Sequence, residues 1–373
     1  MTIYLDYNAT APVRPEVIDK IKEILSLPAN ASSVHSYGRM AKKHLEDARR
    51  IISDHISCWP DEVIFMGSAT EANATALGCA DKILVSAVEH SSILRSNCVI
   101  PVDTNGIVKL DALEEMLAEQ KPTLVSVMLA NNETGVLQPI AEIAKLCKAR
   151  NAFLHCDAVQ GLGKIPVDCG VLGVDMLTLS AHKCGGAVGA SALIVRRGTP
   201  FTPLFSGGQE SRRRAGTENV AAIAGFAKAI ELFDFVHMHN VRKWRDVMES
   251  VILSKAKDLQ KAGDSSASPQ NDKIIFGKSA QRLPNTTCVS MLGVSHETQL
   301  MDFDLKGFAV SAGSACSSGR IESSHVLAAM GVPENIAKTA IRISAGWNTK
   351  EEDIKSITSA WLSTCERLAK KIV

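Results

Sequence analysis

Between residues 60 and 200 the sequence alternates between two hydrophobic periods, and this alternation limits the fold more than any other feature. Segments with helical spacing lie at 36–57, 70–80, 110–120 and 139–150. Short strand-like runs separate most of them: Glu62–Met66, Lys82–Ala87, Thr123–Ala130, Asn151–Cys156, Asp175–Leu179 and Ala190–Val195. Such alternation is typical of βαβ units, so the sequence predicts an α/β fold with a mostly parallel central sheet.

The last third of the chain has a different pattern. A long helix is expected over 218–257, and the small, polar residues of 261–272 predict a surface loop. A few strands, a Gly/Ser-rich loop at 311–319 and helices near 323–330, 334–340 and from 351 follow. This mixture predicts a smaller α+β domain. We expect a large domain over 14–250 and a small domain made of 1–13 and 251–373.

Composition excludes several classes of protein. The chain has 373 residues and a formal charge of +1, which argues against binding nucleic acid or a membrane surface. No apolar run reaches the roughly 18 to 20 residues that a membrane helix needs, and the first residues do not resemble a signal peptide. The 10 cysteines form no Cys-x-x-Cys pair. They predict mostly buried, reduced thiols and a cytoplasmic protein.

The segment from Val174 to Gly186 combines a strand with a lysine. A mostly apolar run of six residues leads into Ser180-Ala181-His182-Lys183 and then a Cys-Gly-Gly turn. The carboxyl end of a strand in an open α/β sheet is where ligands bind. A lysine placed there, against an apolar wall, can attack a carbonyl carbon. An exposed loop lysine is the alternative interpretation.

Polar residues follow four other predicted strands. The segment Gly67–Glu71 contains a capping box and opens a helix, whose amino end suits a phosphate group. Asp157 ends a strand, where a carboxylate could keep a ring nitrogen protonated or simply cap a helix. His90 follows another strand and could stack on a planar ligand. Asn131–Gly135 forms one more polar cluster. Their common position at strand ends predicts one site.

Two residues of the last third are also candidates. Arg342 alternates with isoleucines in a predicted strand, so it points away from them and could bind a substrate carboxylate. A surface arginine on an edge strand is the alternative. Cys316 lies in a Ser/Gly-rich loop, which suits an accessible nucleophile. Cys184 is interpreted as wall packing, and a metal site at His237 and His239 is not expected, because residues two apart on a helix diverge.

Taken together, these segments resemble the cysteine desulfurases over nearly the whole chain, in the branch of the iron–sulfur cluster and nitrogenase sulfur donors. The motifs that carry the resemblance are these: Tyr4-Leu5-Asp6-Tyr7-Asn8-Ala9-Thr10, Ser68-Ala69-Thr70-Glu71, Glu89-His90, Asn131-Asn132-Glu133, Asp157-Ala158-Val159-Gln160, Ser180-Ala181-His182-Lys183, Arg214-Ala215-Gly216-Thr217 and Ser314-Ala315-Cys316. The resemblance implies the aspartate-aminotransferase-like fold (fold type I of pyridoxal-phosphate enzymes) and a homodimer.

The resemblance also implies a role for each matched residue. Lys183 would hold pyridoxal 5'-phosphate covalently, Asp157 would pair with the ring nitrogen and His90 would stack on the ring. Arg342 would bind the substrate carboxylate, and Asn132 would contact both ring and substrate. The remaining implied cofactor contacts are Gln160 to the ring oxygen, and Ala69, Thr70, Ser180, His182 and the partner subunit's Thr217 to the phosphate.

The implied reaction removes sulfur from L-cysteine, producing L-alanine and a persulfide on Cys316. The sulfur would pass to acceptor proteins such as an iron–sulfur scaffold, and Cys316 could ligate a cluster transiently; no resident metal is expected. A selenocysteine lyase, another fold-type-I enzyme or a non-catalytic sulfur-transfer scaffold are the alternatives. A mobile thiol has no use in transamination, and a scaffold would not need Lys183, Asp157 and His90 together. The sequence does not identify the sulfur acceptor.

Overall fold

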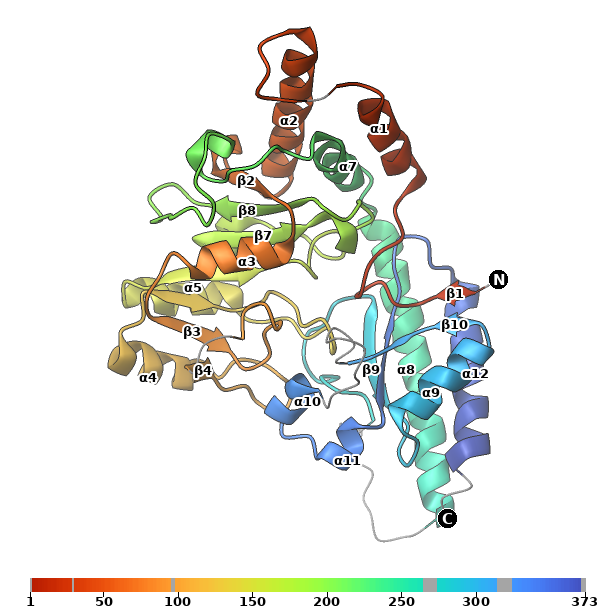
Figure 1. The fold of residues 1–373 in the computed structure, drawn as a ribbon. Coiled ribbons are helices and arrows are strands. Elements are labelled where there is room, and N and C mark those ends of the chain that lie inside the picture. Colours follow the sequence, from red (N-terminus) through yellow and green to blue (C-terminus); the bar gives the residue numbers. More distant parts are fainter. Residues whose placement is uncertain (1, 29, 95–97, 264–273, 314–323, 370–373) are drawn as a thin grey trace.

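Figure 1 shows the computed structural model of the protein, which describes residues 2–28, 30–94, 98–263, 274–313 and 324–369. A seven-stranded sheet forms its largest layer, in the order β2-β8-β7-β6-β5-β3-β4. The pairing is parallel from β7 through β4, and β8 runs antiparallel to both of its neighbours. The predicted mostly parallel sheet is therefore confirmed. Its strands are β2 (Val63–Met66), β3 (Ile83–Ser86), β4 (Val99–Ile100), β5 (Leu124–Ser126), β6 (Phe153–Asp157), β7 (Met176–Ser180) and β8 (Ser191–Val195).

Helices cover both faces of this sheet. The strand β2 shows why: Val63 and Phe65 belong to one buried apolar cluster, whereas Ile64 and Met66 belong to another. Successive side chains of a strand point to opposite faces, so a fully apolar strand needs cover on both. One face packs on α3, and the other on α2 and α5. The helices of this part are α1 (Pro15–Leu25), α2 (Ser36–His55), α3 (Ala69–Leu77), α4 (Leu110–Gln120), α5 (Ile140–Ala149), α6 (Cys169–Leu172) and α7 (Val220–Glu231).

A third apolar cluster lies beside a three-stranded antiparallel sheet, in the order β11-β12-β9. Figure 1 shows two long helices, α8 and α12, side by side behind this sheet. Ile341 and Ile343 of β12 belong to the cluster, together with Trp361 of α12. The elements are β9 (Thr286–Ser290), β11 (Ser311–Ala312), β12 (Ala340–Ser344), α8 (Phe235–Gly263), α9 (His296–Leu305), α10 (His325–Ala329), α11 (Glu334–Ala337) and α12 (Glu351–Ala369).

The N-terminal segment packs into the apolar cluster beside the three-stranded sheet. Strand β1 (Ile3–Tyr4) pairs in parallel with β10 (Phe308–Ala309), and Asp6 forms a bridge with Ser344. Leu5 is fully buried in the same cluster, as are Met238 and Val241 at the start of α8. The division into domains of 14–250 and of 1–13 with 251–373 stays a prediction.

Two predicted elements were wrong in their extent. The single helix expected over 218–257 is two helices, because α7 ends at Glu231 and α8 begins at Phe235. The Asp234 side chain caps the second helix by accepting a hydrogen bond from the amide of His237, at 2.9 Å. Residues 261–263 of the loop expected over 261–272 are helical, since α8 continues to Gly263; residues 264–273 lie outside the described part.

Most described cysteines are buried or half-buried, as predicted, and Cys98 is exposed. Among the nine cysteines that the structure describes, no disulfide forms. In the described ranges, no helix combines the length and apolar character needed to cross a membrane.

Candidate active site

The strands β2, β3, β5, β6 and β7 all point the same way, so their carboxyl ends meet at one edge of the sheet. A cavity of about 450 Å³ opens at this edge and extends to the second sheet through Arg342. The residues at its wall include ten of the predicted site residues: Ala69, Thr70, His90, Asn132, Asp157, Gln160, Ser180, His182, Lys183 and Arg342. Cavities of this size and place bind small molecules in other α/β proteins.

Lys183 follows β7 through a single 3-10 turn, Ala181–Lys183. Its Nζ donates hydrogen bonds to the backbone oxygens of Asn8 and Ala9, both at 2.7 Å. The chain then turns away at Gly185, whose φ is +95° and where a Cβ would lie 2.9 Å from the Arg14 side chain. Glycine is needed for this approach. Cys184 is buried, and burial raises its pKa to about 12, so it packs as a neutral thiol.

Asp157 ends β6 and is buried at the cavity wall. Its Oδ2 accepts a hydrogen bond from Asn73 Nδ2 at 2.9 Å, and its Oδ1 accepts one from the amide of Val159 at 3.0 Å. Burial raises the pKa of Asp157, while these two bonds oppose the shift. The sequence reasoning missed Asn73, although it lies one helical turn after the predicted phosphate-binding residues.

The tautomer of His90 follows from its neighbour. The amide of Ser92 donates to Nδ1 at 3.2 Å, and the Ser92 hydroxyl lies 2.9 Å from the same atom. Because an amide only donates, Nδ1 is an acceptor and the neutral ring carries its proton on Nε2. Burial lowers the pKa of His90 despite the nearby Asp157 carboxylate. The imidazole can therefore stack as a neutral ring or exchange a proton through Nε2.

The amino end of α3 faces the cavity. Ser68 caps it, with its hydroxyl accepting from the amide of Glu71 at 3.1 Å. The Glu71 carboxylate accepts from the amide of Gly67 at 2.7 Å instead of closing the expected capping box on Ser68. The first N–H groups of a helix have no partner within it, so those of Ala69 and Thr70 can hold an anion.

Ser180 and His182 complete this end of the cavity. The Ser191 hydroxyl donates to that of Ser180 at 3.0 Å across the β7–β8 pair. His182 Nδ1 lies 3.2 Å from the Thr10 hydroxyl, and burial lowers the pKa of His182 to about 4. Its ring is therefore neutral near pH 7.

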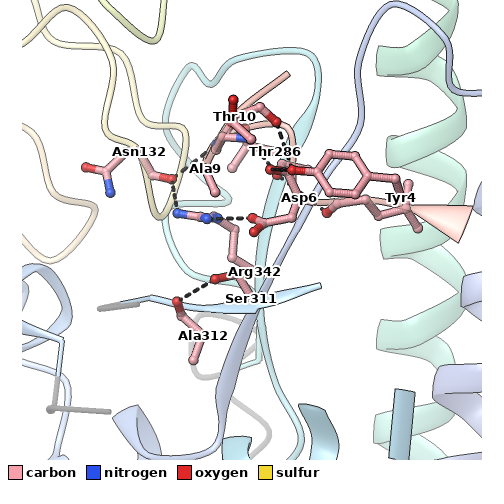
Figure 2. Close-up of polar contacts among 12 residues, drawn as sticks. Tyr4, Asp6, Ala9, Thr10, Asn132, Thr286, Ser311, Ala312 and Arg342 are labelled. Carbon is pink, nitrogen blue, oxygen red and sulfur yellow. Dashed lines mark hydrogen bonds and ion pairs between the residues drawn. The ribbon is translucent and has the colours of Figure 1, made fainter. Parts of the chain in front are cut away.

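Arg342 of β12 also lines the cavity, and Figure 2 shows its polar contacts. It points away from the isoleucines of β12, as predicted, and is 2% exposed, so the edge-strand alternative was wrong. Nη2 forms an ion pair with Asp6 Oδ1 at 2.7 Å, and Nη1 donates to the backbone oxygen of Asn132 at 3.1 Å. These two contacts hold the guanidinium between the N-terminal segment and the Asn131–Gly135 cluster.

Two predicted site residues remain, Thr217 and Cys316. Thr217 is exposed, which leaves its predicted contact in a partner subunit a prediction. Cys316 lies in 314–323, outside the described residues. The flanking residues do lie near the cavity: the Ser324 hydroxyl donates to Glu133 at 2.5 Å, and His325 Nε2 lies 2.9 Å from the backbone oxygen of Glu89.

No group of three or more potential metal ligands occurs in the ranges that the structure describes. His237 Nε2 lies 3.1 Å from the backbone oxygen of Gly346, and His237 and His239 are not part of a described metal-ligand cluster. The expectation of no resident metal stays a prediction.

The fold and the cavity define a fold-type-I enzyme of the pyridoxal-phosphate class, and comparison with known proteins agrees. The chain belongs to the aminotransferase class-V family, whose profile matches residues 3–357. It is 38% identical to a cysteine desulfurase IscS of Dictyoglomus turgidum, covering 99% of this chain and 95% of that protein. It is 37% identical to a cysteine desulfurase of Nostoc sp., covering 98% and 93%.

A solved structure is similar over the same length. The X-ray structure of a NifS-like protein from Rickettsia africae has a TM-score of 0.86 and 37% identity, and the match covers 98% of this chain and 100% of that one. The family uses pyridoxal phosphate. The described cavity fits this cofactor, because the buried Asp157 carboxylate, the Lys183 amine and the amino end of α3 correspond to its ring nitrogen, aldehyde and phosphate.

Proposed function

We propose that the protein is a cysteine desulfurase, which removes sulfur from L-cysteine and produces L-alanine and a persulfide on Cys316. The observation that carries this proposal is the convergence of Lys183, Asp157, His90 and Arg342 on one cavity. An amine, a buried carboxylate, a neutral imidazole and a buried guanidinium together suit an amino acid substrate bound to a phosphorylated pyridine cofactor.

The proposed cofactor residues would contact different parts of the cofactor. Pyridoxal 5'-phosphate, bound through Lys183, supplies an electron sink for bonds to the α and β carbons of an amino acid. Asp157 would keep the ring nitrogen protonated, and His90 would stack on the ring. Gln160 and Asn132 would contact the ring oxygen. The amino end of α3 would hold the phosphate with Ala69, Thr70, Ser180 and His182, joined by Thr217 of the partner subunit.

Arg342 binds the substrate carboxylate. Its guanidinium is already held by Asp6 and by the Asn132 backbone, so little rotational freedom is lost when the carboxylate arrives. Binding there places the substrate amine near Lys183 and its side chain on the open side of the cavity. His90, neutral with Nε2 protonated, is positioned to move a proton beside the ring.

The sulfur step balances without an external oxidant or reductant. The Cys316 thiolate attacks the substrate sulfur, the carbon–sulfur bond breaks and a sulfur–sulfur bond forms. The carbon that loses sulfur gains a proton, so the thiol and L-cysteine become a persulfide and L-alanine. Ser324 and His325, the first described residues after this segment, contact Glu133 and the backbone of Glu89.

The partners follow from this chemistry. We propose a homodimer, in which each subunit completes the other's phosphate site, and acceptor proteins such as an iron–sulfur scaffold that take the persulfide sulfur. The described cysteines form no disulfide, which supports a reducing, cytoplasmic location.

The test uses the purified full chain with pyridoxal 5'-phosphate. We expect a yellow protein that borohydride bleaches and labels at Lys183, and that releases L-alanine from L-cysteine. C316A should keep the cofactor and its spectral response to L-cysteine but form no persulfide and release no sulfide. The proposal fails if Lys183 is not labelled, or if C316A releases sulfide at the wild-type rate.

A further inference from the structure

Lys164 is a buried lysine that none of the roles above explains. It is 6% exposed and lies below the floor of the cavity, four residues after Gln160. Its Nζ donates to Gln160 Oε1 at 2.5 Å and to Asn8 Oδ1 at 2.9 Å. A buried ammonium is costly unless its hydrogen bonds serve the structure or the site, so these two contacts need an explanation.

The local sequence brings this lysine back under the site. After Asp157 the chain makes tight turns, and the amide of Lys164 donates to the backbone oxygen of Gly161 at 3.1 Å. Gly163 has φ +75°, and a Cβ there would lie 2.8 Å from the Phe233 ring. Only glycine combines this conformation with this approach. The turn therefore returns the lysine side chain to the glutamine that precedes it.

The chemistry of the ammonium determines which way two amides face. Lysine only donates hydrogen bonds, whereas either end of an amide can turn toward a partner. Lys164 therefore requires the oxygens of Gln160 and Asn8. The nitrogen of Gln160 donates one hydrogen bond to the backbone oxygen of Asn8 at 2.9 Å. Gln160 lines the cavity, so the second N–H of this nitrogen is left for a ligand. The nitrogen of Asn8 donates to the backbone oxygen of Asn132 at 3.1 Å.

Two further basic side chains lie near Lys164. Within the described residues, both hydrogen-bond acceptors of Lys164 Nζ are neutral amides and no carboxylate contacts it. Burial, Lys183 and Arg342 all lower the pKa of Lys164. A cation-rich wall with a fixed N–H donor fits an anionic oxygen, which is the form that a pyridoxal ring oxygen takes when bound.

We propose that Lys164 is a positioning residue, which acts through Gln160 by fixing its amide as a hydrogen-bond donor toward the ring oxygen of the cofactor. This inference rests on the proposed function. It adds a residue, placed below the cavity floor, that controls how the site recognises the ring.

The test measures cofactor binding in K164M, which keeps the length of the side chain and removes its donor. We expect the Kd for pyridoxal 5'-phosphate to rise about tenfold to a hundredfold, the loss expected for one charge-assisted hydrogen bond. We also expect the pH titration of the bound cofactor's visible absorbance to shift, because the ring oxygen loses its oriented donor. K145M, at an exposed position of α5, serves as the matched control and should change neither.

A second background separates positioning from general structural support. In Q160A, adding K164M should change the Kd by less than about twofold, since the residue through which Lys164 acts is gone. Equal losses in the wild-type and Q160A backgrounds would overturn the inference, as would a K164M protein with unchanged Kd and absorbance titration.

The experiment also distinguishes a variant that does not fold from a failure of the proposed function. If K164M does not fold, K164Q, whose amide still donates, is compared in both backgrounds with the same expectation of a smaller loss. If the wild-type protein binds no pyridoxal 5'-phosphate, the proposed function fails with it. Wild-type binding combined with a silent K164M overturns this inference alone.

Discussion

The Asp6–Arg342 ion pair offers the sharpest test of how the two parts of the chain build the substrate site. The side chains are 19% and 3% exposed, and Nη2 lies 2.7 Å from Oδ1. Among the described residues, Nε of the buried guanidinium has no hydrogen-bond partner. In D6A, Arg342 keeps its contact to the Asn132 backbone (Figure 2) but loses the carboxylate with which it forms an ion pair.

The expected magnitude follows from burial. Two unit charges at this separation attract by about 6 kcal/mol at an effective dielectric constant of 20, and desolvation offsets part of it. Removing one partner of a fully buried pair costs about 3–5 kcal/mol. Because water still reaches Asp6, we expect D6A to lower the unfolding free energy by about 3 kcal/mol. D6N keeps an acceptor oxygen and should lose about half as much.

D6A should also change the kinetics of the reaction with L-cysteine. Without Asp6 the guanidinium is less well oriented for a carboxylate, so the KM for L-cysteine should rise about tenfold, with a smaller change in kcat. Urea denaturation measures the stability, and L-alanine release over a range of cysteine concentrations separates KM from kcat. A D6A protein within about 0.5 kcal/mol of wild type, with an unchanged KM, would refute the reasoning.

Three more predictions follow from the same geometry. Burial raises the pKa of Glu89 from 4.5 to about 8, so the folded state binds a proton that the unfolded state releases between these values, and stability falls as pH rises through that window. E89Q should flatten this fall in urea titrations at pH 5 and 8, and an unchanged slope would contradict it. D157N should still bind pyridoxal 5'-phosphate but release L-alanine at least about a hundredfold more slowly; a rate near wild type would argue against its ring-nitrogen role. If Thr217 acts across the dimer, mixing inactive K183A with T217A subunits regenerates one intact site and restores L-alanine release, whereas a contact within one chain restores none.

Much of the candidate site could be predicted because it lies at strand ends. Asp157, Ser180 and Lys183 follow apolar runs whose period is visible in the sequence, and parallel strands deliver their carboxyl ends to one edge. The prediction did not extend to Asn73, which itself lines the cavity. It also did not extend to Lys164, which contacts the site through Gln160 and Asn8. The break between α7 and α8 was missed because the apolar pattern continues across it, although Asp234 marks the new helix.

By itself, the sequence determined the alternation of strands and helices, the fully apolar strands that require two covered faces, and the polar residues that end them. These features depend on neighbours within a few positions, and local periodicity records them. Only the tertiary structure decided that Asp6 meets Arg342 across 336 positions of chain, and that Lys164 lies beneath Gln160 with Asn8 as its second acceptor. The Asp6–Arg342 contact depends on how the N-terminal segment packs against β12. The Lys164 contacts depend on a turn that passes close to Phe233, which only glycine allows. The spacing of residues along the chain encodes neither arrangement.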